Sequence, residues 1–235
     1  MRYAINFTPP ASDPLTLAAS QWLGRNAFSG EAMEPPAIRG LGLHEIAFNT
    51  AVPRRYGFHG TLRPPFRLAD GVIEPLLLRQ LMHFAGQQQP VRLPKMEVVR
   101  LGNRFALMPS RPCDDLHHLA ASVVQHVETL RAPMSEAELE RADPGQLSAG
   151  QFANLHRYGH PFVMDEFRFH MTLTGAVGPE EIGRFEEVLR RYFEPFLERP
   201  VNVGNLALFI EPEPGAPFLV HSLHPLGSVA SRRIA

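Results

Sequence analysis

The pattern Phe-His-x-Thr-Leu occurs twice in the sequence, at residues 58–62 and 169–173. On a β-strand, side chains two residues apart point to the same face, so the His and the Thr share one face while the apolar residues share the other. The polar pairs are His59 with Thr61 and His170 with Thr172. Two such faces brought together would line one small cavity with paired imidazoles and paired hydroxyls. This set is suited to acid–base chemistry on a phosphate ester without a metal.

A phosphodiester can be hydrolysed by two imidazoles in opposite protonation states. The neutral imidazole takes a proton from water, and the protonated one gives a proton to the departing alkoxide. Both forms exist near neutral pH because a free imidazole titrates near pH ~6.5. Threonine hydroxyls can donate to phosphate oxygens that gain charge, and an arginine can bind two such oxygens. Strand alternation therefore predicts His59 and His170 as the catalytic pair, and Thr61, Thr172, Arg63 and Arg168 as substrate-binding residues. The sequence leaves open which histidine is the base.

Similar runs of elements follow the two motifs. After each motif the sequence predicts a helix, a strand, a turn and a second strand. The helices are expected at residues 73–87 and 179–196, and the hairpins at residues 91–109 and 201–224. Such a duplication would place equivalent residues across a shared cleft. We predict an α+β fold in which two pseudo-symmetric lobes with mainly antiparallel sheets face a central cleft, with helices outside.

The chain is expected to form a single bilobal domain over residues 1–235. The first motif lobe covers about residues 56–131, and the second motif lobe covers about residues 166–226. Between them, an insert of about residues 132–165 interrupts the regular alternation of elements.

The insert is richer in charge, Gly and Pro than its surroundings, and short helices are expected near residues 135–142 and 148–157. Loops of special composition often cover a site. Arg157 and Tyr158 are therefore candidates to contact the far end of a substrate. The alternative is a solvated excursion with no functional role, and the sequence does not decide whether the insert is a lid.

The overall charge favours a small partner over a long polyanion. The formal net charge is -1 and the sequence pI is about 6.8. Proteins that bind long nucleic acids usually carry a basic surface, because neutralising phosphates supplies most of the affinity. We therefore expect a small anionic phosphodiester as the substrate. A nucleic-acid end bound by a local patch is an open alternative but is not favoured, and the sequence does not give the oligomeric state.

The remaining features argue against several other classes of protein. Cys113 is the single cysteine, so no disulfide can form within the chain, which suits a reducing compartment. No apolar stretch approaches the ~20 residues that cross a bilayer, and the N-terminus lacks a signal-peptide pattern, so a cytoplasmic location without membrane contact is expected. His156 and His160 are four residues apart, but Gly159 and Pro161 interrupt a helix there. With no His-Glu-x-x-His pattern, neither a metal nor a cofactor is predicted.

Longer stretches around the motifs resemble a known family. The two motifs look like the signature motifs of the 2H phosphoesterase superfamily. Residues 55–66, 155–159 and 167–175 are similar to its branch found with bacterial phosphonate-utilisation genes. The resemblance covers most of the chain, and it implies a bilobal α+β fold and metal-independent cleavage of cyclic or 2′,5′-type phosphodiesters. It also implies the same assignment of site residues, with His59 and His170 catalytic and Thr61 and Thr172 holding the phosphate.

The resemblance suggests a substrate that the residues alone do not give. Because the branch is found with phosphonate-utilisation genes, the resemblance suggests that the substrate is a phosphorylated ribose cyclic phosphate in phosphonate metabolism. The first alternative is an RNA 2′,3′-cyclic or 2′,5′-end processing phosphodiesterase or ligase, which would need a basic track leading to the cleft. The second is a non-catalytic module that binds a phosphorylated metabolite, although binding alone does not need two titrating groups.

Overall fold

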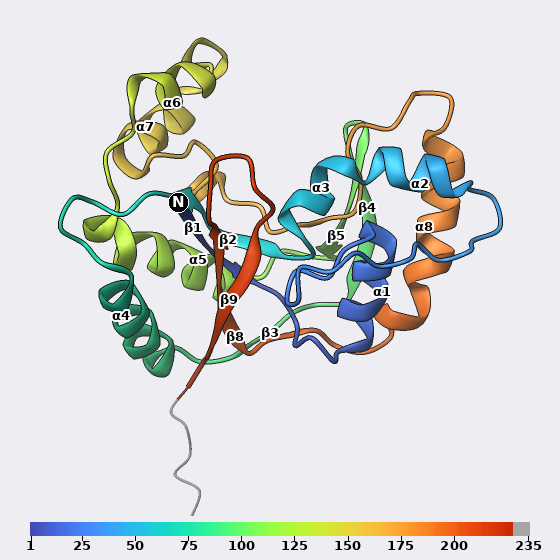
Figure 1. The fold of residues 1–235 in the computed structure, drawn as a ribbon, viewed down its shortest axis with the longest axis horizontal. Coiled ribbons are helices and arrows are strands. Elements are labelled where there is room, and N and C mark those ends of the chain that lie inside the picture. The colour runs from blue at the N-terminus through green and yellow to red at the C-terminus, as the bar shows by residue number, and fades with distance from the viewer. Residues whose placement is uncertain (228–235) are drawn as a thin grey trace, which may run out of the picture.

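The computed structural model describes residues 1–227, and its centre is one continuous sheet (Figure 1). The sheet contains seven strands in the order β4-β5-β6-β2-β1-β8-β9, all paired antiparallel. These strands are β1 (Arg2–Phe7), β2 (Gly60–Phe66), β4 (Met96–Leu101), β5 (Arg104–Pro109), β6 (Met171–Thr172), β8 (Asn205–Glu211) and β9 (Leu219–Pro225). β3 (Val91–Arg92) and β7 (Asn202–Val203) pair with each other in a separate ladder. The predicted α+β class with antiparallel pairing is confirmed.

Helices flank the sheet, with α4 and α5 on one side of Figure 1 and α1, α2 and α8 on the other. Their bounds are α1 (Pro14–Leu23), α2 (Leu43–Asn49), α3 (Ala51–Tyr56), α4 (Glu74–Gln87), α5 (Asp114–Val127), α6 (Glu136–Arg141), α7 (Ala149–Tyr158) and α8 (Ile182–Leu197). Short 3₁₀ turns lie at Glu128–Leu130, Pro144–Gln146 and Met164–Glu166. Apolar residues three or four apart make each long helix amphipathic, as Phe185, Leu189 and Phe193 do on α8. α5 packs on β2 and α8 packs on β4.

The sheet order shows how the two sequence repeats are combined. The motif strands β2 and β6 are neighbours near the middle of the sheet. The β4–β5 hairpin follows β2 in the chain, yet it pairs with β6, whereas the β8–β9 hairpin follows β6 and reaches β2 through β1. Each half therefore supplies a hairpin to the motif strand of the other half. The ranges 56–131 and 166–226 describe a repeat along the chain whose strands share one sheet.

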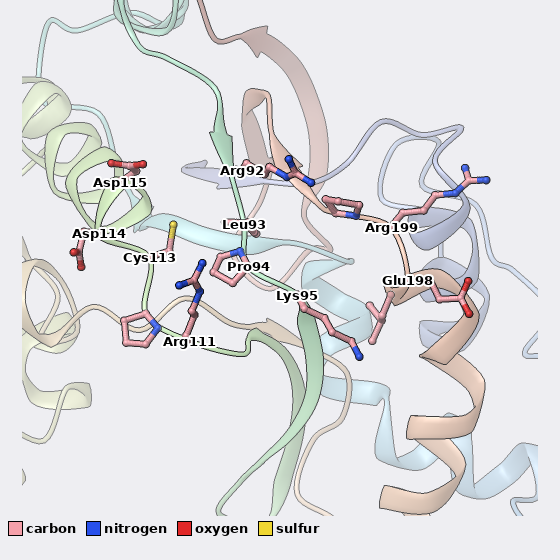
Figure 2. A pocket seen from close by; sticks show the side chains of 13 residues that line it. Arg92, Leu93, Pro94, Lys95, Arg111, Cys113, Asp114, Asp115, Glu198 and Arg199 are labelled. Atoms are coloured by element: carbon pink, nitrogen blue, oxygen red, sulfur yellow. The ribbon is translucent and has the colours of Figure 1, made fainter.

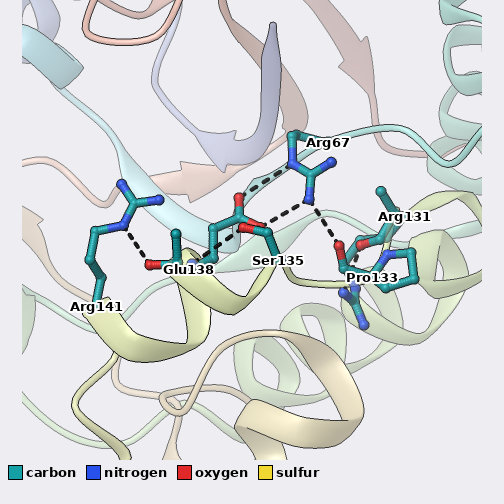
Figure 3. Close-up of polar contacts among 8 residues, drawn as sticks. Arg67, Arg131, Pro133, Ser135, Glu138 and Arg141 are labelled. Atoms are coloured by element: carbon teal, nitrogen blue, oxygen red, sulfur yellow. Dashed lines mark hydrogen bonds and ion pairs between the residues drawn. The ribbon is translucent and has the colours of Figure 1, made fainter.

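The insert is attached to the end of β2 mainly by polar contacts (Figure 3). The Arg67 guanidinium donates to Glu138 at 2.9 Å and to the carbonyl of Pro133 at 2.9 Å. Glu138 also closes a capping box with Ser135, which starts α6. No residue of α6 is buried. The expected helices near 135–142 and 148–157 correspond to α6 and α7.

No helix within residues 1–227 combines the length and the apolar composition that a bilayer crossing requires.

Candidate active site

The two motifs meet side by side in the sheet. The backbone of Gly60 in β2 pairs with that of Met171 in β6, in an antiparallel register. In such a register, the residue that follows one partner is opposite the residue that precedes the other. The polar residues of the two motifs are therefore opposite each other: Thr61 faces His170, and His59 faces Thr172. The hydroxyl of one motif thus lies beside the imidazole of the other.

Two glycines shape the backbone at the first motif, Gly60 within it and Gly57 directly before it. A Cβ added to Gly60 would overlap the ring of Phe169, which packs beneath the motif strands. Gly57 has a φ of 76°, in the region that favours glycine, and a Cβ there would lie 2.5 Å from the Cβ of Ala27. The chain therefore turns tightly from α3 into the first motif.

In both His59 and His170, the ring nitrogen Nδ1 forms a hydrogen bond to a backbone carbonyl. The Nδ1 of His59 lies 3.0 Å from the carbonyl oxygen of Gly57, and the Nδ1 of His170 lies 2.8 Å from that of Arg168. A carbonyl oxygen only accepts, so each Nδ1 carries a proton and donates it. In the neutral rings, Nε2 is then the basic nitrogen. The Nε2 of His59 lies 3.1 Å from the hydroxyl of Thr61.

The two imidazoles differ in their surroundings. Burial lowers the pKa of His59 to about 4, the Gly57 carbonyl opposes this change, and the nearby His170 lowers the pKa further. His59 is therefore neutral at physiological pH. His170 is exposed. The repeat supplies equivalent residues, while the packing around them makes the two sides of the site unequal.

The polar residues of both motifs line one cavity of about 790 Å³. One wall is aromatic and contains Tyr56, Phe209 and Phe218. The Tyr56 and Phe218 rings stack with centroids 5.4 Å apart, and the Phe209 ring centroid lies 5.5 Å from that of His59. This apolar wall is what withdraws His59 from water and lowers its pKa.

The structure does not place Arg63 in the cavity, which corrects the prediction from strand alternation. Arg63 is 1% exposed and does not line the cavity. Across the β1–β2 pair, Asn6 is opposite Thr61 and Ile5 is opposite Arg63, so one step along β1 matches two steps along β2. This bulge breaks the period of two. Arg63 instead faces Glu128 beside α5, with 3.7 Å between charged atoms.

Of the other three residues predicted to bind the substrate, one lines the cavity and two do not. Arg168 is exposed and lines the cavity, as expected. Tyr158 does not line it, because its ring is buried against Val124 and Val163. The guanidinium of Arg157 lies 5.2 Å from the centroid of the Tyr158 ring, also outside the cavity. The insert does reach the site, but through other residues.

Several cavity residues were not predicted from the sequence. They are Asn6 on β1, Arg104 on β5, Tyr56 at the end of α3, Gln151, His160 and Phe162 from the insert, and Glu166 directly after it. Asn6 is 2% exposed, and its Oδ1 has no hydrogen-bond partner within residues 1–227. A polar residue inside the apolar run of β1 is the signal that could have identified it. The insert residues gave no such signal, because their positions depend on tertiary packing.

A second cavity, of about 780 Å³, lies between β3, the start of α5 and the end of α8 (Figure 2). Arg92, Lys95, Arg111 and Arg199 surround it together with Asp114, Asp115 and Glu198. It contains no residue of either motif. Within residues 1–227 no cluster of three or more His, Cys, Asp or Glu side chains is arranged to hold a metal ion. The cavity with both histidines is therefore the candidate active site.

Comparisons with known sequences give a family and two curated relatives. A family model described as "Protein of unknown function (DUF1045)" matches residues 61–219. A protein named Ribose 1,5-bisphosphate phosphokinase PhnN, from Janthinobacterium sp. (strain Marseille), is 35% identical over 235 residues, which is 98% of this chain and 52% of that protein. A protein of the same name from Laribacter hongkongensis (strain HLHK9) is 32% identical over 218 residues, covering 93% of this chain and 50% of that protein. The chain spans about half the length of these relatives.

The solved structures that align with this chain have low sequence identity to it. TT0787 of Thermus thermophilus aligns with a TM-score of 0.46 and 17% identity, over 97% of this chain and all of that one. LigT of E. coli, solved in complex with 3′-AMP, aligns with a TM-score of 0.42 and 13% identity, over 96% of this chain and 98% of that one.

Proposed function

We propose that this chain, which belongs to the DUF1045 family, is a phosphodiesterase. In this proposal it hydrolyses a small cyclic phosphodiester without a metal. The observation that carries this proposal is the antiparallel register of Gly60 with Met171. It aligns both polar motif pairs along one cavity, with each Nδ1 bound to a backbone carbonyl. Two imidazoles that present Nε2 to one space can move two protons at one phosphorus.

We assign His59 as the general base. Its pKa, lowered by burial, keeps it neutral at pH 7, so Nε2 can take a proton from an attacking water. The water oxygen bonds to phosphorus, and the ring P–O bond breaks. Protonated His170 gives its Nε2 proton to the departing oxygen. The products are a phosphate monoester and a free hydroxyl, and a proton exchange with solvent restores both rings.

The remaining polar groups suit the developing charge on the phosphate. Thr172 can donate its hydroxyl proton to a non-bridging oxygen, and Thr61 can do the same once its hydroxyl turns away from Nε2 of His59. The exposed guanidinium of Arg168, which also lines the cavity, can orient the anion. Donors fixed on two paired strands need little rearrangement when charge develops.

The names of the curated relatives support a finer choice of substrate. Both are named for a kinase that acts on ribose 1,5-bisphosphate. Hydrolysis of the 1,2-cyclic phosphate of ribose 5-phosphate, at the bond between phosphorus and O2, would yield ribose 1,5-bisphosphate. The proposed substrate is therefore 5-phosphoribosyl 1,2-cyclic phosphate, in line with the resemblance to the phosphonate-associated branch.

The charge around the cavity favours this small substrate over an RNA end. An RNA-processing enzyme would need a basic track that leads to the histidines. The arginines among the described residues that line the cavity are Arg104 and Arg168. The larger group of basic side chains, which includes Arg92 and Arg111, surrounds the second cavity (Figure 2).

A panel of cyclic phosphates tests the proposal. Protein pretreated with a chelator is incubated with 5-phosphoribosyl 1,2-cyclic phosphate, a nucleoside 2′,3′-cyclic phosphate and a 2′,5′-linked dinucleotide. ³¹P NMR identifies each monoester that forms. Turnover of the first substrate is expected to be fastest. His59→Ala and His170→Ala should each reduce it by roughly 10²–10⁴-fold.

Exposed His83 on α4, whose ring nitrogen lies 3.1 Å from Gln87, provides the matched control, and His83→Ala should keep full activity. Turnover that depends on added metal would contradict the proposal. Binding of the cyclic phosphates without any turnover would favour the non-catalytic alternative.

A further inference from the structure

One carboxylate lines the candidate active site, and it needs an explanation. Among the described residues that line the cavity, Glu166 is the acidic one. A carboxylate repels a phosphate anion, and the repulsion is larger where water is partly excluded. Glu166 therefore disfavours the proposed substrate unless it makes a compensating contact with an uncharged part of it.

Glu166 is held in place by the start of α7. The side-chain amide of Gln151 donates to Oε2 of Glu166 at 3.1 Å. The carbonyl oxygen of the same amide accepts from the backbone N–H of Ser148, also at 3.1 Å, within the capping box of α7. Neither contact involves Oε1, the other oxygen of the Glu166 carboxylate. A Cβ at Gly150 would lie 3.4 Å from Oε1, so the absence of a side chain there leaves space beside it.

His160 adds a donor to the same cavity. Its Nδ1 accepts from the backbone N–H of Phe162 at 3.2 Å, so the proton of the neutral ring is on Nε2. This tautomer is the opposite of that in His59 and His170. Burial, with a smaller effect from the charge of Arg63, lowers the pKa of His160 to about 4. At neutral pH the uncharged ring of His160 therefore offers one hydrogen-bond donor, its Nε2–H.

An exposed aromatic ring completes this region. Phe162 is 52% exposed although it is large and apolar, and it lines the same cavity, with its ring centroid 5.9 Å from that of His160. A carboxylate acceptor, a neutral N–H donor and an open ring match a sugar, which has hydroxyl groups and apolar C–H faces. We propose that Glu166 and His160 form a hydroxyl-recognition subsite that binds the sugar of the substrate. The proposal deepens the function above and rests on it.

A pair of substrates separates hydroxyl recognition from a structural role. The first is 5-phosphoribosyl 1,2-cyclic phosphate, and the second is its 3-deoxy analogue. In Glu166→Ala, kcat/KM for the hydroxylated substrate is expected to fall by about 10–100-fold, because hydrogen bonds to charged groups are strong. For the deoxy analogue, the same change should leave KM unchanged or lower it, since a repulsive charge is removed. A fall of equal size for both substrates would show that Glu166 only supports the fold.

Matched variants sharpen the test. Glu140 is exposed on α6 and does not line the cavity, so Glu140→Ala should change neither substrate. His160→Phe should weaken turnover of the hydroxylated substrate by about 5–30-fold, and His160→Gln, which keeps an N–H donor, should restore part of it. Equal activity of these two His160 variants would overturn the donor role.

A binding measurement separates this proposal from the proposed function. Calorimetry with D-ribose 5-phosphate and its 3-deoxy analogue requires no turnover. Weaker binding of the hydroxylated sugar to Glu166→Ala, with the deoxy sugar unaffected, would support the subsite even if no cyclic phosphate were hydrolysed. If both sugar phosphates bind the wild type and Glu166→Ala equally, the subsite is refuted, whatever the activity.

Discussion

Protonation of His59 offers a quantitative test of the electrostatics of the site. Burial, with a small contribution from His170, lowers its pKa from 6.5 to about 4, despite the opposing Gly57 carbonyl. At about 1.4 kcal/mol per pKa unit, charging this ring costs roughly 3 kcal/mol more in the folded protein than in water. If His59 is the base, kcat/KM should not fall as the pH is lowered from 7 to 5, because the base stays neutral while the acid becomes more fully protonated. It should then decline tenfold per unit below about pH 4.

The assay needs a substrate that does not titrate in this range. A cyclic diester without a monoester phosphate is suitable, because a monoester has its second pKa near ~6. Circular dichroism at each pH separates loss of the base from loss of the fold, and His83→Ala should follow the wild-type profile. An acid limb centred near pH 6.5 would refute the assignment of half-buried His59 as the base.

The same shift predicts a dependence of stability on pH. The folded pKa of His59 lies below the unfolded value, so the unfolded chain binds the proton more tightly. Stability should therefore fall as the pH drops from about 6.5 to about 4, by at most roughly 3 kcal/mol, and change no further below that from this group. Urea unfolding of the wild type and of His59→Gln tests this: the stability of the wild type minus that of the variant should be lower at pH 4.5 than at pH 7. A difference independent of pH would contradict the shift.

Four further changes test separate parts of the structure. With a p-nitrophenyl phosphodiester, whose leaving group needs no proton, His170→Ala should recover most of its lost rate while His59→Ala should not; recovery in both variants would refute the acid and base assignments. Gly60→Ala should destabilise the protein by about 1–3 kcal/mol in chemical denaturation and reduce turnover at least tenfold, because the added Cβ overlaps an aromatic ring. Arg63→Met should leave KM within about twofold of wild type, since this side chain does not line the cavity, and a large rise in KM would show that it reaches the substrate. Burial alone would raise the pKa of Glu211, but hydrogen bonds from two arginines and a backbone N–H hold it at about 2. Glu211→Gln should therefore lower the free energy of unfolding by about 2 kcal/mol at pH 7, and the wild type should lose this contribution as the pH falls from 4.5 towards 2.

The centre of the site could be predicted from the sequence because it depends on a local period. His59 and Thr61 share a face by the geometry of any strand, and the second motif repeats the pattern. Hydrophobic spacing likewise predicted the long helices α4 and α8 within a few residues. Arg63 shows the limit of this reasoning. A single extra residue in the pairing of β1 with β2 reversed its side, and strand alternation alone does not account for that bulge, although Pro64 and Pro65 directly after Arg63 are a signal of irregular pairing.

Long-range pairing accounts for the other differences. The β4–β5 hairpin could have joined β2, which precedes it, but pairs instead with β6. The insert is similar: its helices were expected near their observed positions, yet Tyr158 packs inward while Gln151, on the same helix, reaches the cavity. Helical spacing gives the set of residues on a face, whereas only tertiary contacts decide which part of the molecule that face meets.

The central claim is that His59 and His170 act on the same phosphorus atom. A crystal structure of the protein with vanadate, which mimics the five-coordinate transition state of phosphoryl transfer, tests this most directly. The expected result is one vanadate in the cavity, with the Nε2 atoms of both histidines within about 3 Å of different oxygens. Vanadate bound by one histidine alone, or held among Arg92 and Arg111 in the second cavity with the motif residues unoccupied, would contradict the claim.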